Sequence, residues 1–175
     1  MLNLLRNIRT SFTYLDKEMM RKIITSVIRL RLEYAAVIWS PHEKKHIRKL
    51  ERVQRAATKM TPELQDLPYE ERLARMQLTT LEKRRERGDM IILFRLLNGM
   101  ENIDRGDLYE MNVRETRGHG RKLKAATCRR HIKKYSFPHR SIEAWNGLEE
   151  KVVCAGNIHI FKEKLDKYSY GDGTV

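Results

Sequence analysis

The residues best suited to chemistry in this chain are regularly spaced cations. At about 100° per residue, positions three and four apart share one side of a helix, and the cations over 44–59 would form a stripe about 80° wide. Glu51 is the only acid near this stripe. Such spacing predicts contact with the phosphates of a nucleic acid, with a solvated outer face as the alternative. The stripe consists of Lys44, Arg48, Arg52, Arg55 and Lys59.

A second basic segment spans 114–140 and contains a single acid, Glu115. We expect an arm that wraps nucleic acid, with Tyr135 and Phe137 available to stack on bases. The alternative is a basic tail of degenerate sequence. The cations expected to contact nucleic acid in this segment are Arg121, Lys122, Lys124, Arg129, Arg130, Lys133 and Lys134.

Metal and hydrolytic chemistry have weaker support. Cys128-x-x-His131 and Cys154-x4-His159 have spacings that a zinc ion could use, but no other feature supports a site. The 6 histidines are scattered, and none pairs by sequence with an obvious nucleophile or carboxylate. We therefore expect no metal, no cofactor and no catalytic residue.

Composition agrees with a polyanionic partner. The 175 residues carry a formal net charge of +13, which favours nucleic acid first and an anionic membrane surface second. No uncharged apolar run reaches the roughly 18–20 residues of a membrane span. Two cysteines do not make a disulfide scaffold, so we expect an intracellular protein of the nucleus or cytoplasm. A mitochondrial presequence is the weaker alternative, because Arg6 and Arg9 precede any acid.

Helices must position the stripe. The apolar run 19–39, with Asp16 as its cap, predicts a first main helix that reaches about Trp39. Ser40, Pro41 and Glu43 form the pattern of a capping box and predict a second helix, which ends at Met60 before Pro62. The face of this helix opposite the cations should join a core through Ile47, Leu50, Val53, Ala57 and Met60.

The remaining pattern is also mainly helical. Thr79-x-x-Glu82 predicts a capping box for a helix that is buried over 90–97 and stops at Asn98-Gly99. Trp39 and Trp145 are expected to anchor the core. Further helices are expected over 2–12, 67–76, 136–148 and 157–168, an acidic linker over 101–110, and a hairpin or extended arm over 123–135.

Residues 32–59 also resemble a known family. The segment that follows the polymerase palm in reverse transcriptases of jockey-type non-LTR (LINE) retrotransposons reads LEYA-x-x-x-W-S-P-H and continues into a basic helix with L-E-x-V-Q-R-x-A-T-K. The matching residues are Leu32-Glu33-Tyr34-Ala35, Trp39-Ser40-Pro41-His42, Leu50-Glu51, Val53-Gln54-Arg55 and Ala57-Thr58-Lys59.

The resemblance extends over about 8–167. Tyr69 to Leu73 is similar to the family's Y-E-E-R-L, Leu81 to Asp89 to its L-E-x-R-R-x-R-G-D, and Trp145 to Leu148 to the start of its W-N-x-L-P. Glu149 stands where the family usually has proline. The family's paired catalytic aspartates, in an aromatic-Ala-Asp-Asp motif, have no counterpart in these residues.

The resemblance implies a thumb-like region that holds a template-primer duplex of RNA or DNA, without polymerase activity of its own and with a separate polymerase palm as a further partner. The expected fold is mainly α: a four-helix thumb-like bundle over 1–100, an acidic linker over 101–113, and a basic arm with two further helices over 114–175. The alternative is a domesticated or degenerate helical interaction module with no nucleic-acid role.

Overall fold

The structure is a computed structural model that describes residues 2–112, 118–124 and 131–170. Its regular structure is helical, which confirms the mainly α prediction. In these ranges the only β pairing is one antiparallel bridge, between Met111 and Leu123. None of the described helices is long and apolar enough to cross a bilayer.

Contacts between Cα atoms divide the chain into two compact units. The first unit comprises residues 1–36 and 41–84, and the second comprises 37–40 and 85–174. The division after Arg84 falls within one continuous helix, α6 (Leu81–Leu97). The boundaries expected from the sequence were different: changes in composition placed them after residues 100 and 113.

The first unit opens with α1 (Leu2–Ser11) and then a continuous helical run. This run consists of α2 (Lys17–Ile23), the π-helical segment η1 (Ile24–Ile28) and α3 (Arg29–Glu33). The predicted cap is confirmed, because the side chain of Asp16 accepts a hydrogen bond from the Met19 N–H at 2.7 Å.

The helical run ends earlier than predicted. Tyr34 leaves helical backbone space with φ −54° and ψ 126°, and Ala35 has a positive φ of 51°. The helix therefore ends at Glu33 and does not continue to Trp39. The prediction that both tryptophans anchor the core is confirmed for Trp145, which is 0% exposed. It is wrong for Trp39, which is 40% exposed.

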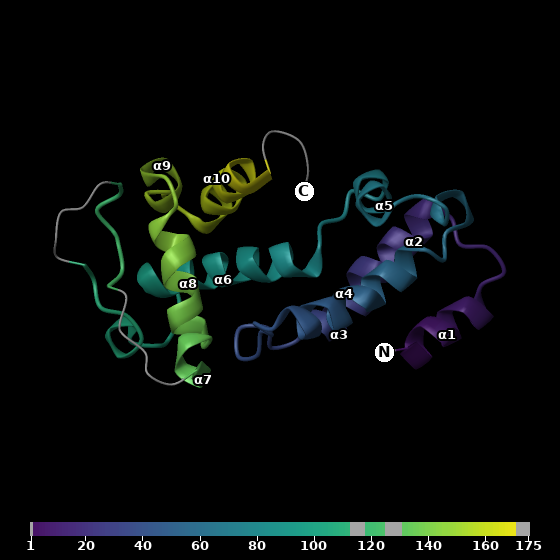
Figure 1. Ribbon diagram of the computed structural model, residues 1–175. Coiled ribbons are helices and arrows are strands. Elements are labelled where there is room, and N and C mark those ends of the chain that lie inside the picture. The colour runs from purple at the N-terminus through teal and green to yellow at the C-terminus, as the bar shows by residue number, and fades with distance from the viewer. Residues whose placement is uncertain (1, 113–117, 125–130, 171–175) are drawn as a thin grey trace. The chain divides into compact units, whose positions relative to one another are not determined.

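Helix α4 (Lys44–Thr58) is the centre of the first unit. It contacts α1, α2, η1 and α5 (Tyr69–Arg75), and Figure 1 shows it beside α2. The predicted inner face is confirmed: Val53 and Ala57 are buried, and Ile47, Leu50 and Met60 are half-buried. Burial of this apolar face is the main force that fixes the orientation of the helix.

Neither predicted capping box forms. The N-cap of α4 is Glu43, whose side chain makes no capping bond and instead pairs with Lys45 at 2.8 Å. At α6 the cap is Thr80, one residue later than predicted, and its hydroxyl accepts from the Lys83 N–H at 3.3 Å. The backbone carbonyl of Thr79 accepts hydrogen bonds from the side chains of Arg29 and Gln54.

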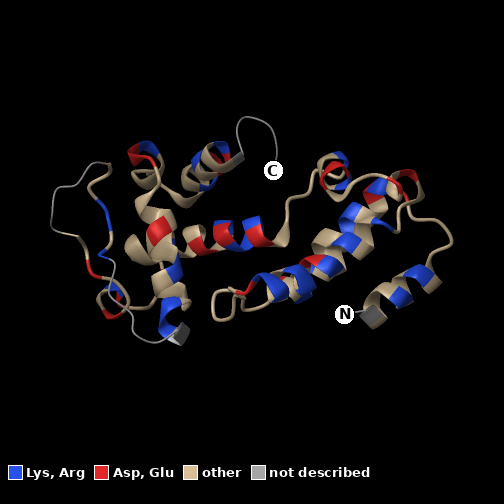
Figure 2. Ribbon diagram, viewed as in Figure 1, with Lys and Arg blue, Asp and Glu red and all other residues tan. Residues whose placement is uncertain are grey.

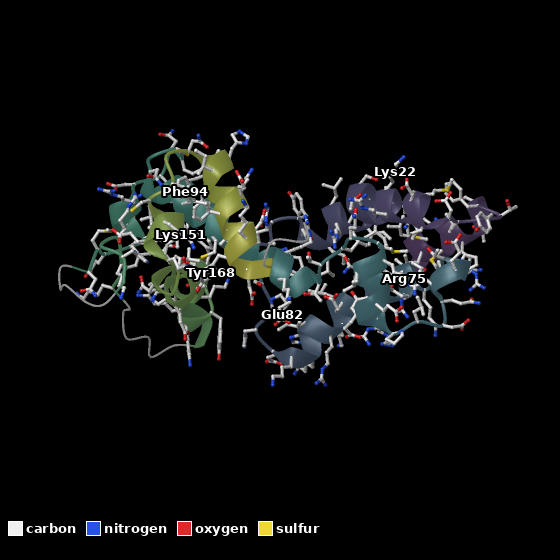
Figure 3. The ribbon with its side chains drawn as sticks, turned by 90° about the horizontal axis from the view of Figure 1, so that it is seen from above. Lys22, Arg75, Glu82, Phe94, Lys151 and Tyr168 are labelled. Carbon is white, nitrogen blue, oxygen red and sulfur yellow. The ribbon has the colours of Figure 1, made fainter. Side chains whose placement is uncertain are left out.

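The second unit packs around the C-terminal part of α6. Its other helical elements are the 3₁₀ turn η3 (Arg105–Asp107), α7 (His131–Lys134), α8 (Phe137–Asn146), α9 (Glu150–Val153) and α10 (Ile158–Tyr170). Phe94, labelled in Figure 3, stacks on Phe161 with ring centroids 4.2 Å apart. The predicted cap of the last helix is confirmed, because Asn157 accepts from the Ile160 N–H at 2.9 Å.

Much of the hairpin or extended arm expected over 123–135 falls on 125–130, which lie outside the described residues. A short antiparallel pairing precedes that segment. Asn112 N–H donates to the Lys122 carbonyl, and Lys124 N–H donates to the Glu110 carbonyl, each at 2.8 Å. The side chain of Asn146 holds the centre of this pairing by bonding both the N–H and the carbonyl of Leu123 at 2.8 Å. Residues 131–134, expected to be non-helical, form α7.

Helices α5 and α6 both end with a residue in left-handed backbone conformation, Gln77 in the first and Gly99 in the second. At the end of α5, the Leu78 N–H donates to the Leu73 carbonyl, and Gln77 has a left-handed backbone with a φ of 52°. At the end of α6, Gly99 occupies the equivalent position with a φ of 67°. Left-handed backbone costs a side-chain-bearing residue free energy that glycine does not lose. We expect Gln77→Gly to stabilise the first unit by about 0.5–1 kcal/mol.

The matched opposite change is Gly99→Ala, which should destabilise the second unit by about 1 kcal/mol. A Cβ at Gly99 would meet no atom within 4 Å, so this loss would come from the backbone alone. Urea unfolding followed by circular dichroism measures both changes. Shifts of equal sign in the two variants would contradict the argument.

Candidate nucleic-acid interface

The predicted cationic stripe lies along the outer face of α4. Lys44, Arg48, Arg52, Arg55 and Lys59 are all exposed. Figure 2 shows basic residues recurring along this helix. At 1.5 Å per residue the stripe extends about 22 Å along the helix axis. Lys45 and Lys49, which the prediction omitted, are exposed beside it and broaden the basic surface.

Most of the stripe is available for an external anion. Within the described ranges, no carboxylate lies within 4.0 Å of the side-chain nitrogens of Lys44, Arg48, Arg52 or Lys59. Cations without protein partners keep their full charge for phosphates and release counterions when they bind them.

The single acid of α4 is turned away from the stripe. Glu51 accepts a short hydrogen bond from the Tyr69 hydroxyl and a bond of 3.0 Å from the Leu81 N–H at the start of α6. Burial, followed by the hydrogen bond to Glu51, raises the pKa of Tyr69, so the phenol remains protonated and continues to donate. The carboxylate therefore joins three elements and offers little repulsion to a phosphate on the opposite side.

A buried polar cluster holds α4 in this orientation. The Arg29 guanidinium, 4% exposed, donates to Gln54 at 2.9 Å and to the Thr79 carbonyl at 2.7 Å. Gln54 is fully buried and also donates to the Thr79 carbonyl and to Tyr69, both at 3.0 Å. Burial, and then the charge of Arg84, lowers the pKa of Arg29 to about 10, which still leaves it charged at neutral pH.

Arg55 differs from the other stripe residues. Its guanidinium carbon lies 4.5 Å from the centroid of the Tyr69 ring, a cation–π contact. Arg72 lies over the same ring at 5.5 Å and donates to the Thr58 hydroxyl at 3.1 Å. Arg55 is thus exposed but held in place, so its replacement would disturb packing as well as charge.

The second predicted basic region has a different character. The Arg121 guanidinium bonds the Leu97 carbonyl at 3.5 Å, the Asn98 side chain at 3.1 Å and the Val153 carbonyl at 3.4 Å. Lys124 pairs with Glu110 at 2.7 Å, and this contact raises the pKa of the lysine. The side chains of Arg121 and Lys124, both predicted to contact nucleic acid, thus already bond acceptors inside the protein.

The other predicted cations of this region are placed as follows. Lys122 is half-buried, with the end of its side chain close to Gly118. Lys133 and Lys134 are exposed on α7, and Lys134 lies 5.6 Å from the Tyr135 ring centroid. Arg129 and Arg130 lie outside the described residues. Of the two aromatic residues expected to stack on bases, Phe137 is buried in the core and Tyr135 is half-buried.

Metal chemistry finds no further support among the described side chains, which contain no cluster of three or more His, Cys, Asp or Glu residues able to hold an ion. Cys154 is a free, exposed thiol. Cys128 and the side chain of His131, which completed the zinc hypothesis, are outside the described set. His119, one of the scattered histidines, is a core residue that bonds the Trp145 carbonyl at 3.0 Å.

Comparisons with known proteins gave no match. No protein-family model matches the chain, and neither the curated proteins nor the solved structures contain a significant relative.

Proposed function

We propose that the first unit binds a nucleic-acid duplex, RNA or DNA, through its backbone phosphates along the α4 stripe. The observation that carries this proposal is the exposure of the stripe cations without protein carboxylates nearby, on a helix whose other face is fixed in a core. Phosphate contacts position a protein on a duplex without specifying sequence, so binding should be largely independent of sequence.

The proposal agrees with the role that the family resemblance implies. In a jockey-type reverse transcriptase this region would hold the template-primer while the palm carries out polymerisation. The proposal assigns no polymerase activity to these residues, because the paired metal-binding aspartates have no counterpart in them. The second basic region is left out of the interface, since Arg121 and Lys124 are already bonded within the second unit.

Salt dependence of binding tests the proposal. If the stripe neutralises about three phosphates, log affinity for a duplex should fall with log salt with a slope near −3. Replacing Lys44, Arg48 and Arg52 together by Gln should flatten the slope by about 2–3 units. Arg55 is retained because of its contact with Tyr69. Fluorescence anisotropy with a labelled duplex measures each slope.

A charge-matched control separates the stripe from general electrostatics. Lys17, Lys22 and Arg75 are exposed elsewhere on the first unit, and Figure 3 labels the last two. Their joint replacement by Gln changes the net charge by the same amount and should leave most of the slope. Equal losses in both triple variants would mean that only the overall charge matters, and the proposed interface would be wrong.

The interaction-module alternative has one structural observation in its favour. Three apolar side chains are exposed in or just after the η1–α3 run: Val27 is 37% exposed, Leu30 67%, and Tyr34, which follows α3, 78%. Such residues could contact a protein partner. Absence of duplex binding at low salt would favour this alternative.

A further inference from the structure

The first unit contains an open pocket at the C-terminal end of the cationic stripe. Its volume is about 580 Å³, and it lies between the end of α1, the following loop and the end of α4. Arg9 and Lys59 supply two cations, and Phe12 and Tyr14 supply two aromatic rings. The apolar part of the lining includes Leu15, Ala56, Met60 and Pro62.

The aromatic residues here are exposed rather than part of the core. Phe12 is 41% and Tyr14 57% exposed, whereas Leu15 between them and α2 is 5% exposed and fixes the loop in the core. The Tyr14 hydroxyl donates to Glu63 at 3.0 Å, which restrains the ring although the residue is exposed. Exposed, restrained rings next to cations are the combination that binds unpaired nucleotides: the ring stacks on a base while the cations contact phosphate.

Nearby carboxylates do not occupy the cations. Glu63 is bonded by Tyr14, and Asp16 accepts the capping bond of α2. Within the described part of the chain, neither Arg9 nor Lys59 has a carboxylate within 4.0 Å. Lys59 belongs both to the stripe and to the pocket lining, so a strand that follows the stripe would lead directly into the pocket.

We propose that this pocket holds an unpaired nucleotide of a single-stranded extension, with its base stacked on Tyr14 or Phe12 and its phosphate on Arg9 and Lys59. This inference rests on the proposed binding of a duplex by α4. It adds a preference that the stripe alone would lack: a duplex with an unpaired tail should bind more tightly than the same duplex with blunt ends.

The test uses the full chain with two DNA duplexes of the same sequence, one blunt and one with a short unpaired tail that contains 2-aminopurine. Anisotropy gives the two affinities, and 2-aminopurine fluorescence falls when the base stacks. We expect about a tenfold preference for the tailed duplex, together with quenching of the tail. Tyr14→Ala combined with Phe12→Ala should abolish both the preference and the quenching.

Two further variants show whether stacking is the cause. Tyr14→Phe keeps the ring but loses the bond to Glu63, so it should retain most of the preference. Arg9→Gln should weaken binding of the tailed duplex and leave the salt slope for the blunt duplex unchanged, because Arg9 is outside the stripe. Circular dichroism melts check that each variant is folded.

The outcomes separate the two proposals. Equal affinities for tailed and blunt duplexes, both with a steep salt slope, would overturn the pocket and leave the stripe standing. A preference that survives the double alanine variant would also overturn the pocket. No binding of either duplex at low salt would overturn both proposals.

Discussion

Trp145→Ala is expected to lower the free energy of unfolding of the second unit by about 3–5 kcal/mol. The indole is fully buried on α8, and its N–H donates to the Arg121 carbonyl at 2.9 Å. Its ring centroid lies 6.1 Å from those of both His119 and Phe161. The substitution would therefore remove a large apolar contact and leave the Arg121 carbonyl without this donor.

The other tryptophan of the chain provides the control. Trp39 is 40% exposed, and the Arg85 guanidinium lies 5.2 Å from its ring centroid. Trp39→Ala should cost about 1–2 kcal/mol, clearly less than Trp145→Ala, because two-fifths of Trp39 is already exposed. Urea unfolding followed by circular dichroism compares the two variants. Similar midpoints for the two would show that α8 is not packed as described.

Asp89→Ala is expected to destabilise the second unit by about 3–5 kcal/mol, an effect of similar size with a different cause. Both oxygens of Asp89 accept from Arg140, at 2.7 and 2.9 Å, and both side chains are largely buried. Arg140 also donates to the Val37 carbonyl at 3.0 Å, so it joins 37–40 to α6 and α8. Removing the carboxylate would leave a buried cation without its counter-charge.

A double-mutant cycle isolates the pair. Arg140→Ala should be comparably destabilising, because it leaves the Asp89 carboxylate buried without its partner. Burial raises the pKa of Asp89, and Arg140 acts against this effect by stabilising the charged form. The double variant should cost clearly less than the sum of the two single variants. The exposed pair Arg75–Glu71, at 2.7 Å, is the control, and its cycle should give a coupling of about 0.5 kcal/mol or less. Additive losses at Asp89 and Arg140 would contradict the ion pair.

Several of the motif residues through which the chain resembles the retrotransposon family have structural partners in the molecule. Glu51, Gln54 and Tyr69 belong to the cluster that orients α4. Glu33 accepts two bonds from Arg84, at 2.6 and 3.0 Å. Arg87 bonds Asp166 in the same bidentate way at 2.6 and 2.8 Å. These polar residues act in folding, whereas Lys59, also a motif residue, is exposed at the end of α4.

Most of the helices and the cationic face of α4 could be predicted from the sequence. Both depend on local spacing: apolar residues that recur with the helical period define a buried face, and the cations necessarily lie opposite. The caps at Asp16 and Asn157 were predictable for the same reason, because a cap and its N–H are three residues apart. The cap predicted at Ser40 does not form, since 37–40 belong to the second unit. The N-cap of α4 is Glu43 instead.

The partners of the buried and bonded polar side chains could not be predicted, because folding brings them together from distant parts of the sequence. Arg29 meets Gln54, Arg140 meets Asp89 and Arg87 meets Asp166 across separations of 25, 51 and 79 residues. A basic residue in the sequence carries no sign of whether a distant carbonyl or carboxylate will reach it. Arg121 and Arg48 therefore look alike in the sequence, but folding brings acceptors to the guanidinium of Arg121, while Arg48 remains exposed on α4. Because a buried charge without a partner is costly, the packing of the core decides which cations are bonded inside the protein and which stay exposed.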